Sequence, residues 1–264
     1  MILKDKVIWI TGASSGIGEA LAIGLSKEGA KIIFSARREE ELLRVQKKCQ
    51  LNDKNSLILP LDLADTSNVN MLVEKIIFQF GKIDLLINNG GVSQRSYAKD
   101  TPLSIDRKVM EVNFFGTIAV TKSVLPYLLK QKSGMIVVTS SISGKFGFYL
   151  RSAYSASKHA LHGFFESLRM EIFNDNVKVL IVCPGRIQTN ISLNAINEKG
   201  EKNNVMDAST AAGMPASECA DLIIEAMKEE KEEIFMGGNE LQAVYIKRFF
   251  PKLFSKLIRK QKIE

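Results

Sequence analysis

Short apolar runs recur along the chain, and each is followed by a longer segment whose apolar residues are spaced three or four apart. The short runs predict buried strands, and the wider spacing predicts helices with one buried face. Strands that alternate with helices favour βαβ units and a parallel sheet covered on both faces. The expected strands are Val7–Trp9, Lys31–Ser35, Leu57–Leu59, Asp84–Ile87, Met135–Val138, Val177–Val182 and Glu233–Met236. We therefore predict an α/β fold, a doubly wound parallel sheet of about seven strands with helices on both faces.

Small or polar residues follow these expected strands. Right-handed crossovers bring the carboxyl ends of parallel strands to one edge of the sheet, where ligands bind. The residues expected along that edge are Gly12, Ala36, Asp62, Asn89, Ser141 and Pro184. The sequence thus predicts a single ligand crevice that collects side chains from six strand ends.

The chain has 264 residues, 45% of them hydrophobic, which is enough to bury a sizeable core. We see no repeat, linker or low-complexity stretch and expect a single domain. Residues 186–215 are irregular and rich in Asn, Ser, Thr and Gly. Such a segment is typical either of a lid over a site or of a variable surface loop.

The net charge is +7, and much of the excess lies in a basic, apolar C-terminal extension, residues 241–264. Its basic residues are Lys247, Arg248, Lys252, Lys256, Arg259, Lys260 and Lys262. The rest of the chain has no nucleic-acid motif and no basic patch interleaved with aromatic residues, so no nucleic-acid partner is expected. The extension is predicted either to touch a membrane surface or to pack near the substrate mouth or against another subunit.

Three cysteines, Cys49, Cys183 and Cys219, are widely separated. Their spacing predicts neither a zinc site nor a disulfide framework, so we expect no metal and a reducing compartment such as the cytoplasm. The first strand begins close to Met1, which leaves no room for a signal peptide. No run reaches the roughly eighteen apolar residues that a spanning helix needs.

Tyr154 and Lys158 are four residues apart in a segment with helical spacing, and Ser141 lies upstream of them. A four-residue step places a phenol and an ammonium on one helix face. A fixed cation near a phenol lowers its pKa from about 10 and prepares it to exchange protons with an alcohol or carbonyl. On its own this pair also fits a solvated helix face with one anchored ring. With a hydroxyl from Ser141 on the same reacting oxygen, the set indicates carbonyl and alcohol chemistry.

A glycine-rich turn follows the first expected strand, at Thr11-Gly-Ala-Ser-Ser-Gly-Ile-Gly18, and leads into a helical segment. Gly12, Gly16 and Gly18 allow a tight backbone and let a pyrophosphate approach the helix N-terminus. The spacing differs from the usual Gly-x-Gly-x-x-Gly dinucleotide fingerprint.

Taken together, these motifs resemble the short-chain dehydrogenase/reductase family, over residues 4 to 240. The resemblance is carried by the glycine-rich turn, Asn88-Asn-Gly-Gly91, Asn113 in Val-Asn-Phe-Phe-Gly, Ser141, Tyr154-x-x-x-Lys158 and Pro184-Gly185. Finer matches at Arg151–Ala160, Asn194–Asn197 and Asn204–Asp207 resemble its dehydrogenase/reductase member 7 group. The resemblance implies one Rossmann-like NAD(P)-binding domain over 1–240, with residues 186–215 as a substrate-binding flap.

The resemblance also assigns site residues. The implied catalytic residues are Asn113, Ser141, Tyr154 and Lys158. The implied cofactor-binding residues are Gly12, Ser14, Ser15, Gly16, Ile17, Gly18, Ser35, Arg37, Arg38, Asp62, Leu63, Asn89, Gly90, Tyr154, Lys158, Pro184, Gly185, Ile187 and Thr189. Asn113 is implied to hold a water that joins Lys158 to solvent. Gly90 departs from the Ala that is usual in the family, and we expect tolerance and a looser turn there.

The end of the second strand decides the expected cofactor. An acidic residue there would bind the ribose diol of NAD, and none is present. Ser35, Arg37 and Arg38 instead offer a hydroxyl and two guanidinium groups that suit a 2′-phosphate, so NADP(H) is favoured over NAD(H). The alternative is that the two arginines only begin a solvated helix.

The expected function is an oxidoreductase that interconverts a carbonyl and an alcohol by hydride transfer, with Tyr154 as the acid or base. The apolar extension and the resemblance favour a hydrophobic lipid, steroid, retinoid or similar substrate, and family members are usually homodimers or homotetramers. Two other classes are a cofactor-binding regulator and a membrane-surface interaction protein. His159 and His162 are expected to be ordinary helix residues.

Overall fold

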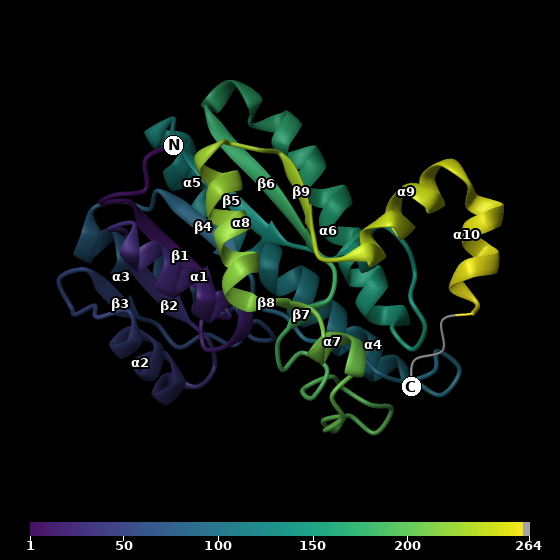
Figure 1. Cartoon of the computed structure of the whole chain (residues 1–264). Coiled ribbons are helices and arrows are strands. Elements are labelled where there is room, and N and C mark those ends of the chain that lie inside the picture. Colours follow the sequence, from purple (N-terminus) through teal and green to yellow (C-terminus); the bar gives the residue numbers. More distant parts are fainter. Residues whose placement is uncertain (261–264) are drawn as a thin grey trace.

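The computed structural model describes residues 1–260, and the last four residues of the C-terminal extension, with Lys262 among them, lie outside the described part. Seven parallel strands form one twisted sheet in the order β3-β2-β1-β4-β5-β6-β9, as Figure 1 shows. They are β1 (Val7–Thr11), β2 (Lys31–Ser35), β3 (Ser56–Ile58), β4 (Leu85–Asn88), β5 (Gly134–Thr139), β6 (Val177–Pro184) and β9 (Glu233–Met236). This confirms the predicted α/β fold.

The longer helices cover both faces of the sheet. They are α1 (Gly16–Lys27), α2 (Glu39–Lys48), α3 (Val69–Phe80), α4 (Leu103–Met110), α5 (Gly116–Gln131), α6 (Ser152–Glu171) and α8 (Ala216–Lys228). Alternate residues of β1 point to opposite sides: Ile8 packs with α1, α2 and α8, whereas Trp9 packs with α3, α5 and α6. The period of two along a strand therefore divides the buried residues into two cores that share one sheet.

Helices α4 and α5 are joined without a break by a π-helical turn, Glu111–Phe115, labelled η1. Together they form one helix, Leu103–Gln131, that is long and apolar enough to cross a membrane by length and composition alone. Of the 18-residue stretch of this helix that meets the test, 44% is buried inside the molecule. The expectation that no segment reaches this length is therefore wrong. Core helices pass the same test, and Val120 and Val124 of α5 pack against the sheet.

Two parts of the chain lie beyond the carboxyl edge of the sheet. Residues 186–215 contain the short strands β7 (Ile187–Gln188) and β8 (Met214–Pro215) and the helix α7 (Ala208–Ala211). The chain then returns through α8 and β9 to a pair of helices, α9 (Gln242–Phe249) and α10 (Pro251–Ile258), drawn in yellow in Figure 1. The strand order reverses between β1 and β4, which places a switch point of the sheet beneath this edge.

Candidate active site

A cavity of about 1360 Å³ opens along the carboxyl edge of the sheet. Its wall holds almost every residue expected at a site: Gly12, Ser14, Ser15, Gly16, Ile17, Ser35, Arg37, Arg38, Asp62, Leu63, Asn89, Gly90, Ser141, Tyr154, Lys158, Pro184, Gly185, Ile187 and Thr189. Of the expected residues, Gly18 and Asn113 stand behind this wall. The structure thus brings together residues from the ends of six strands around one space.

The glycine-rich turn packs too closely for side chains. Gly12 has a φ of 66°, and a Cβ there would lie 2.7 Å from the Cα of Gly90. A Cβ on Gly18 would lie 2.2 Å from the carbonyl oxygen of Gly12. The first residues of α1, Gly16 and Ile17, line the cavity, and the N-terminus of a helix suits a pyrophosphate.

The end of β4 is fastened to this turn. The hydroxyl of Thr11 accepts hydrogen bonds from the backbone N–H groups of Asn89 and Gly90, both at 3.1 Å. The space beside Gly90 is filled, because a Cβ there would lie 2.6 Å from Cδ1 of Leu63. The expectation of tolerance and a looser turn at Gly90 stays a prediction, because this Leu63 methyl group is the movable end of a side chain. Thr11 was missed as a site residue, although it directly precedes Gly12 in the glycine-rich motif.

The residues after β2 divide into a bonded serine and two exposed arginines. Ser35 is fully buried, and its hydroxyl accepts a hydrogen bond from the indole N–H of Trp9 at 2.8 Å. Accepting this bond leaves the hydroxyl hydrogen of Ser35 available, so its expected role as a donor to the cofactor stays a prediction. Arg37 and Arg38 are exposed at the cavity wall, and neither forms an ion pair within residues 1–260. Their guanidinium groups are placed where a phosphate could reach them.

Asp62, which the family resemblance implies to bind the cofactor, lies in the wall of the cavity. Its carboxylate accepts a hydrogen bond from the backbone N–H of Ala64 at 3.0 Å, which is a turn-forming role. The position leaves it in the wall together with Leu63. Both roles are compatible with this geometry.

Ser141, Tyr154 and Lys158 meet at the centre of the cavity wall. Ser141 caps a short helical turn after β5, and its hydroxyl donates to the carbonyl of Pro184 at 3.3 Å. Lys158 lies on α6 one turn after Tyr154, and its Nζ is 5.7 Å from the centre of the Tyr154 ring. The Lys158 ammonium donates to the carbonyl oxygen of Thr139 at 2.7 Å, a partner that the sequence pattern did not reveal.

The electrostatics of this pair differ from the expectation. Burial raises the pKa of Tyr154, and this outweighs the lowering effects of the Arg151 charge and of the Ser141 hydroxyl. Burial also lowers the pKa of Lys158 to about 8. The expectation that Lys158 lowers the pKa of the Tyr154 phenol is therefore wrong for the protein alone. Desolvation has the larger effect on this pKa, and the Lys158 ammonium is directed toward the carbonyl oxygen of Thr139.

Asn113 sits in the π-helical turn η1 and is completely buried. Its amide accepts from the backbone N–H of Val92 at 2.8 Å and donates to the carbonyl of Val92 and to the hydroxyl of Ser157, both at 2.9 Å. The side chain is thus fixed by the protein beneath the loop after β4. The implied water relay stays a prediction.

The flap, residues 186–215, is held to the body of the protein by a buried carboxylate. Asp207 forms ion pairs with Arg95 and, at 2.8 Å, with Arg151, and it accepts a hydrogen bond from Ser192 at 3.0 Å. The backbone of Ile196 adds two hydrogen bonds to the loop after β4, each 2.8 Å long. No local pattern in the sequence singles out Asp207, Arg95 or Arg151.

The C-terminal helices lie at the other side of the same opening. Phe254 of α10 packs edge-on against Phe146 at 5.2 Å between ring centres, and Phe146 is in the cavity wall. Ile258 and Lys260 reach the wall as well. The described residues of the extension therefore pack near the mouth of the site, which is one of the alternatives expected for it.

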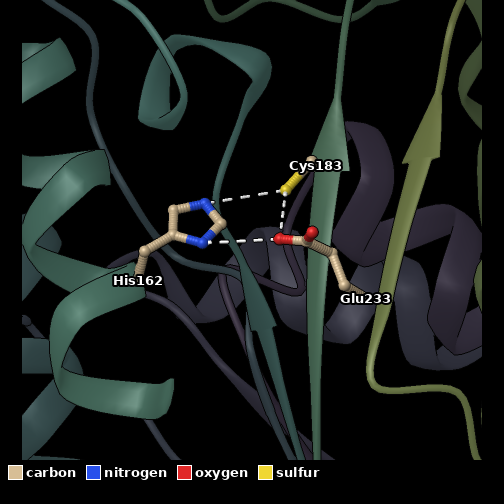
Figure 2. A group of neighbouring side chains, drawn as sticks. All are labelled: His162, Cys183 and Glu233. Atoms are coloured by element: carbon tan, nitrogen blue, oxygen red, sulfur yellow. Dashed lines mark hydrogen bonds and ion pairs between the residues drawn. The ribbon is translucent and has the colours of Figure 1, made fainter. Parts of the chain in front are cut away.

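Figure 2 shows the group of side chains in the described part of the chain that could hold a metal ion, His162, Cys183 and Glu233, whose ligand atoms lie within 4.8 Å of one another. Two of these groups already have partners, because Glu233 pairs with Lys145 at 2.6 Å and His162 lies 3.0 Å from the Ser140 hydroxyl. Burial lowers the pKa of His162 to about 4, which keeps the ring neutral. His162 is thus part of a buried polar cluster rather than an ordinary helix residue, and the expectation of no metal stays a prediction.

Comparison with known proteins gives the family. The short chain dehydrogenase family matches residues 6–200. The chain is 40% identical to the Anopheles gambiae Dehydrogenase/reductase SDR family protein 7-like, over 98% of this chain and 84% of that protein. It is 41% identical to the human Dehydrogenase/reductase SDR family member 7, over 94% of this chain and 75% of that protein. The chain therefore belongs to the short-chain dehydrogenase/reductase family of oxidoreductases.

Solved structures agree on the fold. A short chain dehydrogenase/reductase from Burkholderia phymatum in complex with NAD superimposes with a TM-score of 0.85 at 24% identity, over 96% of each chain. A short-chain dehydrogenase from Streptomyces avermitilis gives 0.80 at 27% identity, over 97% of this chain and 96% of that chain.

Proposed function

We propose that the protein is an NADP(H)-dependent oxidoreductase that interconverts a carbonyl and a primary or secondary alcohol on a hydrophobic substrate. The observation that carries this is the meeting of Ser141, Tyr154 and Lys158 in one cavity wall with the glycine-rich turn. A nicotinamide cofactor fits this wall, since Gly16 and Ile17 at the N-terminus of α1 line the cavity, and the turn before them keeps its close packing only with glycine at positions 12 and 18. When bound, that cofactor supplies or accepts the hydride.

The protein's own groups handle the proton. In the reducing direction Tyr154 donates its phenolic proton to the carbonyl oxygen, while the hydroxyl of Ser141 hydrogen-bonds the same oxygen and holds it in place. Lys158 keeps a positive charge on the same helix face, and Asn113 fixes the loop beside it. In the oxidising direction the Tyr154 phenolate takes the proton back from the alcohol, with the same groups in the same places.

NADP(H) is preferred in this proposal because Arg37 and Arg38 stand exposed at the wall without carboxylate partners in the described chain. Arginine binds phosphate through paired hydrogen bonds, and a carboxylate that would repel a 2′-phosphate is absent from the end of β2. NAD(H), which the similar Burkholderia phymatum protein carries, is the alternative.

A hydrophobic substrate is favoured by the far part of the cavity. Its wall includes the apolar residues Ile142, Phe146, Phe148, Ile191 and Ile258. Burying such surface against an apolar substrate contributes about 25 cal/mol per Å². The lipid, steroid and retinoid classes are therefore the first compounds to test.

The location and assembly of the protein belong to the same proposal. We infer a cytoplasmic protein that forms a homodimer or homotetramer. The assembly is supported by the exposed apolar side chains of Phe115 in η1 and Met170 on α6. Contact with a membrane surface is supported by Phe249, Phe250 and Leu253, which are exposed beside Lys252 and Lys256. Such basic amphipathic helices can lie in a lipid interface. Sedimentation of the protein alone and with anionic vesicles tests both points.

Oxidation of NADPH and of NADH in the presence of hydrophobic ketones, aldehydes, steroids and retinal tests the function. Tyr154→Phe is expected to lose turnover by about a hundredfold or more because the proton donor is gone. Arg37→Ala with Arg38→Ala is expected to weaken NADPH binding by about tenfold or more and to leave NADH binding unchanged. Lys47→Ala with Lys54→Ala, two exposed changes outside the cavity wall, removes the same number of positive charges and is the control for net charge.

Two outcomes would count against the proposal. Full turnover in Tyr154→Phe would remove the assigned proton donor. Tight binding of NADPH with no turnover across the panel would favour a cofactor-binding regulator instead.

A further inference from the structure

Two arginines share one carboxylate beside Tyr154. Arg95, Arg151 and Asp207 have side chains that are only 9%, 12% and 4% exposed. Within residues 1–260 neither arginine has another ion-pair partner, so the buried group carries a net positive charge next to the cavity. Burying a charge without full compensation costs free energy, so a buried net charge in the wall of a site indicates a functional role for that charge.

Arg151 is the member of this group that reaches the phenol. It stands at the residue preceding α6, and its guanidinium carbon is 5.8 Å from the centre of the Tyr154 ring. One of its nitrogens donates to the Ser93 hydroxyl at 2.6 Å and another to Asp207 at 2.8 Å. These two bonds fix the direction of the guanidinium, so the cation is held near the ring by the loop after β4 and by the flap.

We propose that Arg151 is a positioning residue, which Asp207 of the flap holds against Tyr154. The position of the flap then sets how strongly the Arg151 cation favours the ionised form of the Tyr154 phenol. A cation at this distance favours the phenolate. The charge of Arg151 lowers the pKa of Tyr154 against the larger raising effect of burial. The other groups that face the phenol are Lys158 on its own helix and the uncharged Ser141 after β5.

The arrangement links substrate binding to proton transfer. Ser93, Arg151, Asp207 and Thr210 all line the cavity, so a molecule that displaces the flap also displaces the carboxylate that holds Arg151. When the ion pair between Asp207 and Arg151 breaks, the Arg151 side chain can move away from the Tyr154 ring, and its positive charge moves with it. A closed flap therefore favours the phenolate, and an open flap favours the phenol.

The proposal rests on the role proposed above for Tyr154, but its first test needs neither cofactor nor substrate. Ultraviolet absorbance of tyrosinate is followed as pH rises, and the same titration of Tyr154→Phe is subtracted, which isolates one of the five tyrosines. Circular dichroism at each pH confirms that the chain is folded. Arg151→Gln is expected to raise the Tyr154 midpoint by about one pH unit, and Arg151→Lys by less.

Two further variants separate positioning from simple loss of structure. Arg95→Gln breaks the same ion-pair group and keeps the cation beside the ring, so it is expected to shift the midpoint less than Arg151→Gln. Asp207→Asn is expected to raise the midpoint in the parent chain and to add nothing in the Arg151→Gln background, because Asp207 acts through Arg151.

Three results would overturn the proposal. They are an unchanged midpoint in Arg151→Gln, an equal shift in Arg95→Gln, or a downward shift in Asp207→Asn, which would mean that the carboxylate acts only as a nearby anion. Tyr154→Phe that retained full turnover would end the proposed function and leave the titration result standing, so the two failures can be told apart.

Discussion

The two halves of the cavity wall are built in different ways. Between Gly12 and Asn89 the wall is built on backbone at neighbouring strand ends, held by bonds such as that from the backbone N–H of Asn89 to the Thr11 hydroxyl. Beyond Tyr154 it is made of long side chains from the flap and from α10. The first half depends on how closely two backbones approach, and the second on ion pairs and ring contacts. Substitutions in the two halves should therefore fail differently.

The largest effect is expected from Gly18→Ala in the first half. The new Cβ would lie 2.2 Å from the carbonyl oxygen of Gly12, and backbone cannot yield cheaply. We expect a loss of about 3 kcal/mol of stability, with weakened cofactor binding, read from thermal unfolding and from NADPH titration. Gly163→Ala is the matched control, since nothing lies within 4 Å of a Cβ there, and it should gain about 0.5–1 kcal/mol. Equal stability of the two variants would contradict the close approach.

A smaller and more selective effect is expected from Phe254→Ala in the second half. The ring of Phe254 meets Phe146 at 5.2 Å, and such pairs contribute about 0.5–1.5 kcal/mol. We expect the KM for a hydrophobic substrate to rise several-fold while the affinity for NADPH stays the same. Phe249→Ala, which truncates a ring that is 68% exposed, should change neither. A fall in NADPH affinity in Phe254→Ala would break the division between the halves.

The smallest effect concerns the ion pairs that join α1 to α2, behind the first half of the wall. Hydrogen bonds from Arg44, aided by those from Lys48, lower the pKa of Glu19 from 4.5 to about 2 despite partial burial. A lowered carboxyl pKa stabilises the fold above the unfolded value of 4.5 and loses that contribution as pH falls toward 2. Glu19→Gln should therefore unfold at a slightly lower temperature than the parent at neutral pH, and the gap should narrow steadily as pH falls from 4.5 toward 2. A constant gap would mean that charge is not the cause.

The sequence predicts the first half better than the second for a physical reason. Strands appear as apolar runs, and the glycine-rich turn and the Tyr154–Lys158 step involve residues close in the chain, so periodicity and spacing reveal them. All seven strands were placed to within a few residues. Ser141 follows from its place at a strand end, whereas Asn113 was found through the family resemblance, because its partners in space are distant in sequence.

The second half depends on contacts between distant residues that no local pattern encodes. Asp207 meets Arg151 across 56 positions, and Lys158 donates to a backbone carbonyl, which is the same group in every residue. The pKa of Tyr154 was misjudged for a related reason. Spacing shows that a cation is near, but burial, which opposes it more strongly, is a property of the whole packed structure.

The π-helical turn at Glu111–Phe115 holds one residue more than the same stretch of α-helix would need. Losing one residue inside that turn would let the helix from Leu103 to Gln131 continue as a regular α-helix, with its two ends facing nearly the same way as before. Val120 would then stay packed on the sheet, and the cost would fall on the bonds between Asn113 and Val92. A single-codon deletion in the turn should therefore harm the site more than the fold, whereas the same deletion elsewhere in this helix would rotate one end by about 100° relative to the other.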